Sequence, residues 1–314
     1  MTLKKYLWPV VGGATIAVCA WLLYKELRGL SLDDVWDSLS AITPLHWLFA
    51  GLSTLVAYAA LAGYDRIALM HLGRPVNLWF ITVTSFTTYA LSHNVGASVI
   101  SGGVVRYRAY SSKGLSGREI GALIAICSFT FALGTLLLTG VVLILKPHIT
   151  ERFGEGFPID ASSATGYTIL AFIALYVVAS FLRLRPITIG STRLNYPLPK
   201  VVLPQLVIGP LELIGAAGII YFALPEAGNP GFIVVLGTFL ASFSAALISH
   251  APGGLGVLEL VFVMGLPDME AADVIAALLV FRLFYLIIPF AIALGVIFVF
   301  ERTQFRAGRA MDEP

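Results

Sequence analysis

The sequence has 314 residues, of which 58% are hydrophobic and 12% are charged, with a mean hydropathy of +0.89. A soluble domain carries about 25% charged residues, so this composition excludes a soluble globular protein and indicates a polytopic membrane protein. The chain lacks the alternation of apolar and polar positions that is typical of a transmembrane β-barrel. We therefore expect an all-α fold and no nucleic-acid partner, whereas the net charge of +2 says little as a sum.

Full-length membrane spans are predicted from apolar runs, since a helix needs about 20 such residues to cross the hydrocarbon core. The predicted spans are residues 7–24, 45–70, 120–145, 166–182, 200–224 and 274–300. Between the first two, the amphipathic segment SLDDVWDSLSAI, with Ser31 as its N-cap, is predicted to lie on the membrane surface. No small-residue cleavage site precedes Tyr24, so the first run is interpreted as a retained helix rather than a signal peptide.

Two glycine-rich stretches, LSHNVGASVISGGVVRYR (91–108) and ISHAPGGLGVLELVF (248–262), resemble each other. Aligning their Ser-His pairs offsets them by half of the 314 residues. Each follows an apolar run, 78–91 or 232–247, that is shorter than the other predicted spans. We predict two re-entrant helical hairpins in inverted repeats, one in each half of a single transmembrane domain. The halves are approximately 45–145 and 200–300, the domain is 1–314, and no soluble catalytic domain is expected.

Small and turn-forming residues are predicted to break the backbone inside these hairpins. They are Asn94, Gly96, Gly102 and Gly103 in the first, and Pro252, Gly253, Gly254 and Gly256 in the second. Irregular backbone at membrane depth must line a cavity or be buried in protein, and its free N–H groups are able to bind phosphate. The alternative is that these glycines only allow helices to pack closely.

Loop charges support the hairpin topology with both termini in the cytoplasm. With this topology only Lys25, Arg28, Lys146 and Arg152 lie outside, Arg282 lies within a helix, and every other Lys and Arg is cytoplasmic. That distribution is a strong positive-inside bias. It weakens if the first glycine-rich stretch is instead treated as a full crossing.

Charged residues at membrane depth are the main functional candidates, because each costs about 2.5–3.5 kcal/mol to insert. They are Asp65, Arg106, Glu212, Glu259 and Arg282, with Arg108 nearer the cytoplasmic edge. Two structural alternatives remain open. Arg282 could form a buried ion pair with Glu259 or Glu212, and Arg106 and Arg108 could be ordinary positive-inside residues.

His93 and His250 occupy equivalent repeat positions. A histidine there could carry protons or donate to phosphate, or it could simply hydrogen-bond a loop carbonyl. The five His and two Cys show no metal-ligand spacing, and no nucleotide or nucleophile motif is present. We expect neither a metal nor a cofactor, and we expect Cys19 and Cys127 to be reduced and packed.

Two motifs resemble those of a known family: Gly102-Gly103-Val104-Val105-Arg106 with Tyr107 and Tyr110, and Pro252-Gly253-Gly254-Leu255-Gly256 with Glu259. That family is the transmembrane region of bacterial lysylphosphatidylglycerol synthases (multiple peptide resistance factors), in particular its flippase part and the related stand-alone proteins. The resemblance extends over nearly the whole chain and includes Asp65 and Glu212 as acidic residues within helices.

The resemblance implies a flippase in a bacterial inner membrane. Such a protein moves aminoacylated (lysyl) phosphatidylglycerol or a related phospholipid to the outer leaflet, which confers resistance to cationic antimicrobial peptides. It also implies functional roles for Asp65, Arg106 and Glu212. The soluble aminoacyl-transferase domain of the synthases has no counterpart here, so a separate synthase or transferase domain is an expected partner. Two alternatives are the membrane part of an aminoacyl-phosphatidylglycerol synthase and an inert scaffold, and a homodimer is left open. The scaffold predicts that all buried charges pair with one another.

Overall fold

The structure is a computed structural model that describes residues 32–95, 98–153, 162–182, 187–189, 192–194, 197–249 and 254–299. The predicted first helix at 7–24, and the predicted hairpin residues Gly96, His250, Pro252 and Gly253, lie outside these described residues. So do the two chain ends, which leaves the predicted cytoplasmic position of both termini as a prediction.

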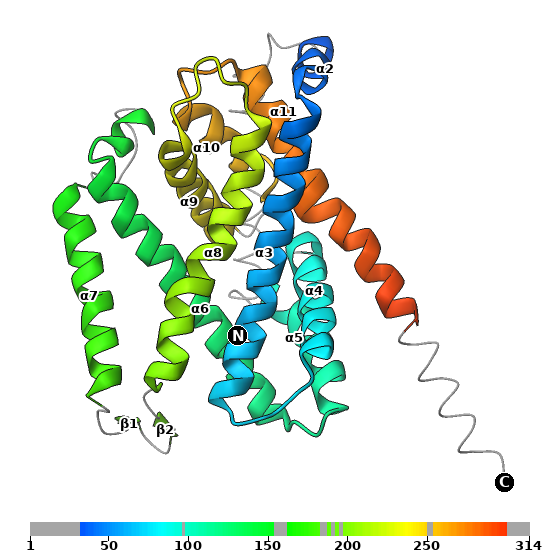
Figure 1. The fold of residues 1–314 in the computed structure, drawn as a ribbon, viewed down its shortest axis with the longest axis vertical. Coiled ribbons are helices and arrows are strands. Elements are labelled where there is room, and N and C mark those ends of the chain that lie inside the picture. Colours follow the sequence, from blue (N-terminus) through cyan, green and yellow to red (C-terminus); the bar gives the residue numbers. More distant parts are fainter. Residues whose placement is uncertain are drawn as a thin grey trace, which may run out of the picture.

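The described chain is almost entirely helical (Figure 1). Its first half contains α2 (Leu32–Ala41), α3 (Pro44–His71), α4 (Leu78–Val95), α5 (Ser98–Ser111), α6 (Gly117–Leu145), the 3-10 turn η1 (Ile149–Phe153) and α7 (Ser163–Phe181). Its second half contains α8 (Pro199–Ala223), α9 (Phe232–Ser249), α10 (Val257–Gly265), α11 (Ala271–Phe281) and the π-helical segment η3 (Arg282–Ile287). Helix continues from η3 to residue 299. The strands β1 (Ile187–Ile189) and β2 (Thr192–Leu194) pair antiparallel between α7 and α8, with Ile187 opposite Leu194.

Six helices of the described part are long and apolar enough to cross a membrane: α3, α6, α7, α8, α9 and the continuous helix Ala271–Val299. The predicted all-α polytopic membrane fold is therefore confirmed. The predicted spans at 45–70, 120–145, 166–182 and 200–224 each correspond to one of these helices. We did not predict α9 as a crossing helix, but its 18 residues meet the same criterion.

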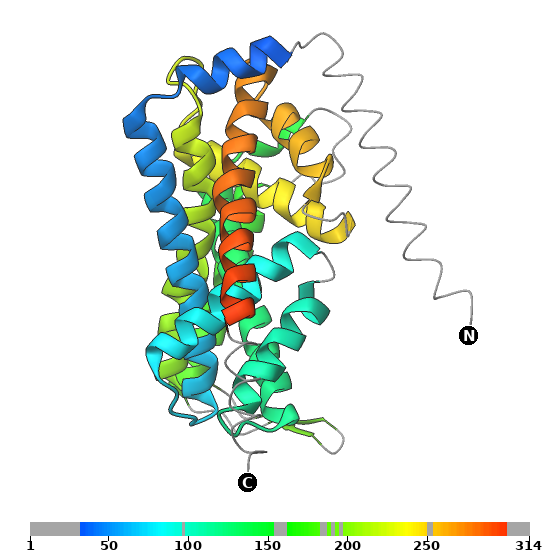
Figure 2. The same ribbon diagram turned by 90° about the vertical axis from the view of Figure 1, so that its right-hand side faces the viewer.

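The two glycine-rich stretches lie in helix pairs. α4 packs against α5, and α9 packs against α10. In Figure 2 the two pairs occupy opposite halves of the long axis, and the ends at which each pair turns face the middle of the bundle. In each pair the first helix runs toward the middle, and the second runs back toward the end of the bundle at which the first began. Re-entrance into a membrane and an inverted repeat stay predictions.

Close backbone contacts hold the central helices together. A Cβ added to Gly134 of α6 would lie 2.4 Å from the carbonyl carbon of Gly209 in α8, and one added to Gly215 of α8 would lie 2.8 Å from the backbone nitrogen of Ala57 in α3. Membrane helices gain little from hydrophobic burial against one another, so small residues that allow such approach dominate their interfaces. α8, which continues through Pro204 and Pro210, is thereby placed between α3 and α6 at the centre of the bundle.

Local sequence sets where the helices that carry the polar residues begin. Pro44 opens α3 directly after its N-cap Thr43, whose side chain accepts from the backbone N–H of His46. Ser116 and Glu119 form a reciprocal capping box at the start of α6.

Candidate functional site

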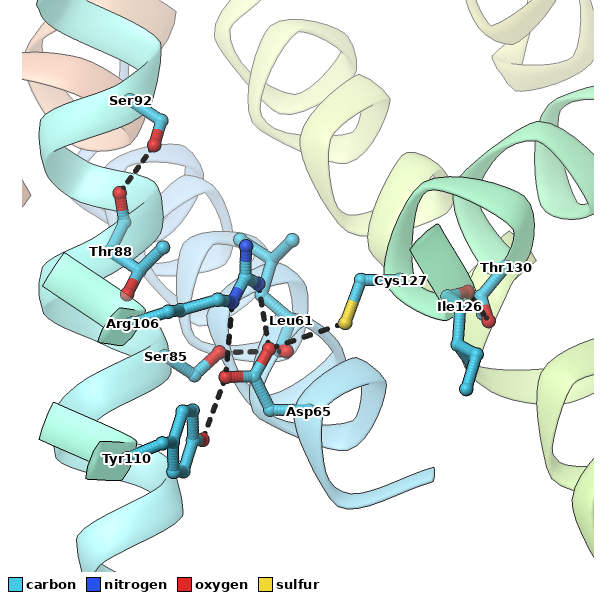
Figure 3. Close-up of polar contacts among 10 residues, drawn as sticks. All are labelled: Leu61, Asp65, Ser85, Thr88, Ser92, Arg106, Tyr110, Ile126, Cys127 and Thr130. Carbon is cyan, nitrogen blue, oxygen red and sulfur yellow. Dashed lines mark hydrogen bonds and ion pairs between the residues drawn. The ribbon is translucent and has the colours of Figure 1, made fainter. Parts of the chain in front are cut away.

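A buried carboxylate, Asp65 of α3, is surrounded by donors from two other helices (Figure 3). Arg106 Nη2 donates to its Oδ1 at 2.7 Å, and Arg106 Nε lies 3.4 Å from its Oδ2. Tyr110 donates to Oδ2 at 2.8 Å, and the Cys127 thiol lies 3.4 Å from Oδ1. Asp65 is 0% exposed and Arg106 is 5% exposed. This is a forked ion pair removed from water, with Arg106 and Tyr110 supplied by α5 and Cys127 by α6.

The arrangement follows from helix geometry. Arg106 and Tyr110 are four residues apart on α5, so both side chains lie on the face that meets α3. α5 reaches that position because it runs back along α4, and Ser85 of α4 donates to the Leu61 carbonyl of α3 at 2.8 Å. Cys127 approaches from the opposite side, on α6.

A second buried carboxylate, Glu212, lies near the middle of α8 and is 2% exposed. Its described partners are hydroxyl groups. Tyr285 donates to Oε1 at 2.5 Å, and Tyr64 lies 3.5 Å from Oε2 while also approaching the Gly209 carbonyl at 3.3 Å. Unlike Asp65, this carboxylate has no Arg or Lys bonded to it among the residues that the structure describes.

Aromatic rings join the two carboxylates. The Arg106 guanidinium lies 4.8 Å from the centroid of Tyr89, and the ring of Tyr89 lies 5.8 Å from that of His93. His93 in turn stacks on Tyr285 at 5.1 Å. We call the set Asp65, Arg106, Tyr89, His93, Tyr285 and Glu212 the polar core. Each member contacts the next, from α3 and α5 through α4 to η3 and α8.

The π-helical segment η3 holds one end of the polar core. Tyr58 of α3 donates to the Tyr285 carbonyl at 2.9 Å, and Asn94 Nδ2 of α4 donates to the Leu286 carbonyl at 3.1 Å. Such single π turns are frequent at functional sites, and here they present backbone carbonyls to neighbouring helices. Asn94 also donates to Ala90 one turn earlier, so it lies within α4.

A third acidic residue, Glu259, forms an ion pair with Arg282, which confirms one of the two structural alternatives for Arg282. Arg282 Nε donates to Glu259 Oε1 at 2.8 Å, and the Gly256 backbone N–H donates to Oε2 at 2.8 Å. Both Gly254 and Gly256 have positive φ, 66° and 79°. The predicted backbone irregularity of the second stretch is therefore present at these two residues, immediately before α10.

Two expectations for the first stretch were wrong. The helix does not end at Leu91 but continues to Val95, so Asn94 stabilises helix instead of breaking it. Gly102 and Gly103 lie inside α5, and a Cβ on Gly102 would meet the Ser92 hydroxyl at 2.4 Å, so at Gly102 the close-packing alternative holds. The buried Nδ1 of His93 has no hydrogen-bond partner among the described residues.

Of the remaining predicted residues, Arg108 is exposed on α5, away from the polar core. Sequence reasoning missed the tyrosines that donate to the carboxylates, Tyr64, Tyr110 and Tyr285, because aromatic residues in spans are usually packing or interface residues. The adjacency of Tyr64 and Asp65, and the spacing of Arg106 and Tyr110, are the signals that could have found them. A separate cavity of about 420 Å³ lies at the far end of α6, lined by Lys146, Arg152, Asp268 and neighbouring residues, and no polar-core residue lines it.

The fold and the polar core define a multi-pass helical membrane protein with buried charged groups between its helices. Residues 10–293 match the family described as the lysylphosphatidylglycerol synthase TM region, and the chain belongs to that family. This confirms the resemblance stated from the sequence.

Relatives fall into two groups. The chain is 31% identical to the uncharacterized protein slr0712 of Synechocystis sp. and 30% identical to the inner membrane protein YbhN of Escherichia coli. The first match covers 95% of this chain and 94% of the relative, and the second covers 93% and 91%. The chain is also 28% identical to the phosphatidylglycerol lysyltransferase of Staphylococcus haemolyticus, over 89% of this chain but only 32% of that protein.

Proposed function

We propose that this protein is a lipid translocator that moves an aminoacylated phosphatidylglycerol, or a related phospholipid with a cationic head group, between the leaflets of a bacterial inner membrane. The observation that carries the proposal is the buried, forked ion pair of Asp65 and Arg106. Intramembrane ionisable groups are costly, so they mark substrate pathways more often than they serve helix packing.

The ion pair has the right chemistry to be exchanged for such a head group. A lysyl-phosphatidylglycerol carries a phosphate anion and ammonium cations on one molecule. When it binds, Arg106 turns its fork to the phosphate and Asp65 accepts one ammonium group, so one buried pair becomes two. Polar atoms without partners lie beside this path, since the Thr88 hydroxyl and His93 Nδ1 on α4 are buried and unbonded among the described residues.

Family membership supports the substrate class. The lysyltransferases of Staphylococcus share this region and, by name, transfer lysine to phosphatidylglycerol. In our proposal this chain handles such a lipid while another protein makes it. Movement toward the outer leaflet, and the resulting protection against cationic peptides, belong to the same proposal.

The test is translocation of fluorescent lysyl-phosphatidylglycerol in proteoliposomes that contain the full chain, read by quenching of the label exposed outside. Arg106→Lys keeps the charge but loses the fork, so we expect translocation to fall at least tenfold. Arg74→Lys is the matched control, because Arg74 also bonds a carboxylate, Glu119, but at the exposed end of the helices. Wild-type rates in a folded Arg106→Lys protein would overturn the site assignment.

A second measurement separates translocation from synthesis. Lipid extracts of cells that express only this chain should contain no new aminoacyl lipid. New lipid in these extracts would instead support the membrane part of a synthase.

A further inference from the structure

Glu212 is a buried carboxylate whose described partners carry no positive charge. Its two oxygens face the hydroxyl groups of Tyr285 and Tyr64. Asp65 is equally buried and the Glu259 side chain is 13% exposed, but each forms an ion pair with an arginine. Hydroxyl donors do not offset the cost of burying an isolated carboxylate, which is several kcal/mol in protein interiors.

Among the described residues, the elements packed against α8 place no buried cation beside Glu212. The buried titratable groups of α3 are Tyr58, Tyr64 and Asp65, and Asp65 is already paired; Arg66 is exposed, and His46 and His71 lie near the two ends of the helix. The buried group of α6 is Cys127, which bonds Asp65, whereas Arg118 is exposed at the start of that helix, and Tyr176 of α7 bonds Gln205.

The remaining elements packed against α8 likewise leave Glu212 without a cationic partner among the described residues. α11 and η3 contribute Tyr285, on which His93 of α4 stacks, and Arg282, which bonds Glu259. α9 has no titratable side chain in its sequence. A neutral environment of this kind stabilises the protonated carboxyl over the carboxylate.

We infer that Glu212 holds a proton in the lipid-free protein and gives it up when the ammonium group of a head group binds in its place. The balance is simple: a carboxylic acid and an ammonium ion become a carboxylate–ammonium pair, and one proton goes to solvent. This exchange rests on the proposed function, and it makes Glu212 the residue through which lipid movement is coupled to protons. Asp65 cannot take this role in the same way, because Arg106 already balances its charge.

The first experiment needs no lipid transport. Infrared spectra of the reconstituted full chain at neutral pH, in water and in deuterium oxide, should contain a carboxylic-acid carbonyl band that shifts on deuteration. We expect Glu212→Gln to remove this band and Glu119→Gln, at the exposed end of α6, to leave it unchanged. Tyr285→Phe keeps the carboxyl but removes its 2.5 Å donor, so it should move the band rather than abolish it. A band that persists in Glu212→Gln would overturn the inference.

The second experiment measures the exchange. Adding lysyl-phosphatidylglycerol to the detergent-solubilised wild-type protein should release about one proton per bound lipid, followed with a pH-sensitive dye in weak buffer. Phosphatidylglycerol, which lacks the amine, should release none, and Glu212→Gln should release none with either lipid. Binding of the lysyl lipid to the wild-type protein without proton release would refute the coupling. If the wild-type protein shows the infrared band but does not bind the lysyl lipid, the proposed function is refuted and the protonated Glu212 still stands.

Discussion

Removing one or both charges of the Asp65–Arg106 pair separates its structural role from its proposed role in transport. Because Asp65 is 0% and Arg106 5% exposed, either single neutralisation leaves an uncompensated buried charge. Breaking a buried pair in this way costs about 3–5 kcal/mol. Asp65→Asn and Arg106→Met should each lower the folding equilibrium constant by roughly two to three and a half orders of magnitude, at about 1.4 kcal/mol per factor of ten.

The double variant Asp65→Asn/Arg106→Met should recover most of the lost stability. It removes both charges, the Met side chain replaces the apolar stem of Arg106, and the Asn oxygen remains available to Tyr110, which now donates to Asp65 at 2.8 Å. Replacing a buried pair by neutral groups of similar volume is often neutral or stabilising. The double variant should nevertheless translocate no lysyl-phosphatidylglycerol, because both groups that would bind the head group are gone.

The free energy of unfolding is measured by equilibrium unfolding in mixed micelles with increasing SDS, and translocation is measured in proteoliposomes. A double variant whose destabilisation equals the sum of the two single variants would show that the charges are not coupled. A double variant that is stable and also transports at the wild-type rate would show that the pair serves structure alone. Either result would refute the reasoning.

Two further predictions concern glycines whose neighbours leave no room for a side chain or whose backbone disfavours one. Gly134→Ala would place its Cβ 2.4 Å from the backbone of Gly209, so we expect the α6–α8 contact to open and unfolding to become easier by about 1–3 kcal/mol. Gly121→Ala on the same helix meets nothing within 4 Å, and in the same SDS titration it should be unchanged. Gly256→Ala forces a φ of +79° on a residue with a Cβ and should cost about 1–2 kcal/mol, whereas Gly295→Ala, which meets nothing within 4 Å, should not. Equal stability within either pair would contradict the packing or the backbone argument.

Hydropathy alone located most of the bundle, because an apolar run of sufficient length has no stable alternative to a membrane helix. α3, α6, α7 and α8 begin and end within a few residues of the predicted spans. The glycine-rich first stretch was harder. Local sequence placed the break after Leu91, but the Asn94 side chain bonds both Ala90 and the distant Leu286, and a contact of that second kind cannot be read from neighbouring residues.

The candidate site was predictable in part for a physical reason. The insertion cost singles out Asp65, Arg106, Glu212, Glu259 and Arg282 wherever they occur, and the structure finds each of them at least partly buried. Their pairing was not predictable, because Asp65 and Arg106 meet only after α4 and α5 fold back on α3. The tyrosine donors were missed for a different reason, since tyrosines inside spans are usually packing or interface residues and only their spacing from charged residues pointed to another role.

Helix association in this bundle does not need its buried charges. α6 and α8 meet through Gly134 and Gly209, and α3 and α8 through Ala57 and Gly215, contacts that already allow the backbones to touch. An inert scaffold would pair every charge that it buries, and Asp65 with Arg106 and Glu259 with Arg282 satisfy that expectation. Glu212 does not satisfy it, because its described partners are tyrosine hydroxyls. A buried carboxylate in the central helix, connected by Tyr285, His93 and Tyr89 to the paired Arg106, is an arrangement that costs stability. It becomes favourable when a cation or a proton occupies the carboxylate, which is the condition that the proposed transport of a cationic phospholipid would supply.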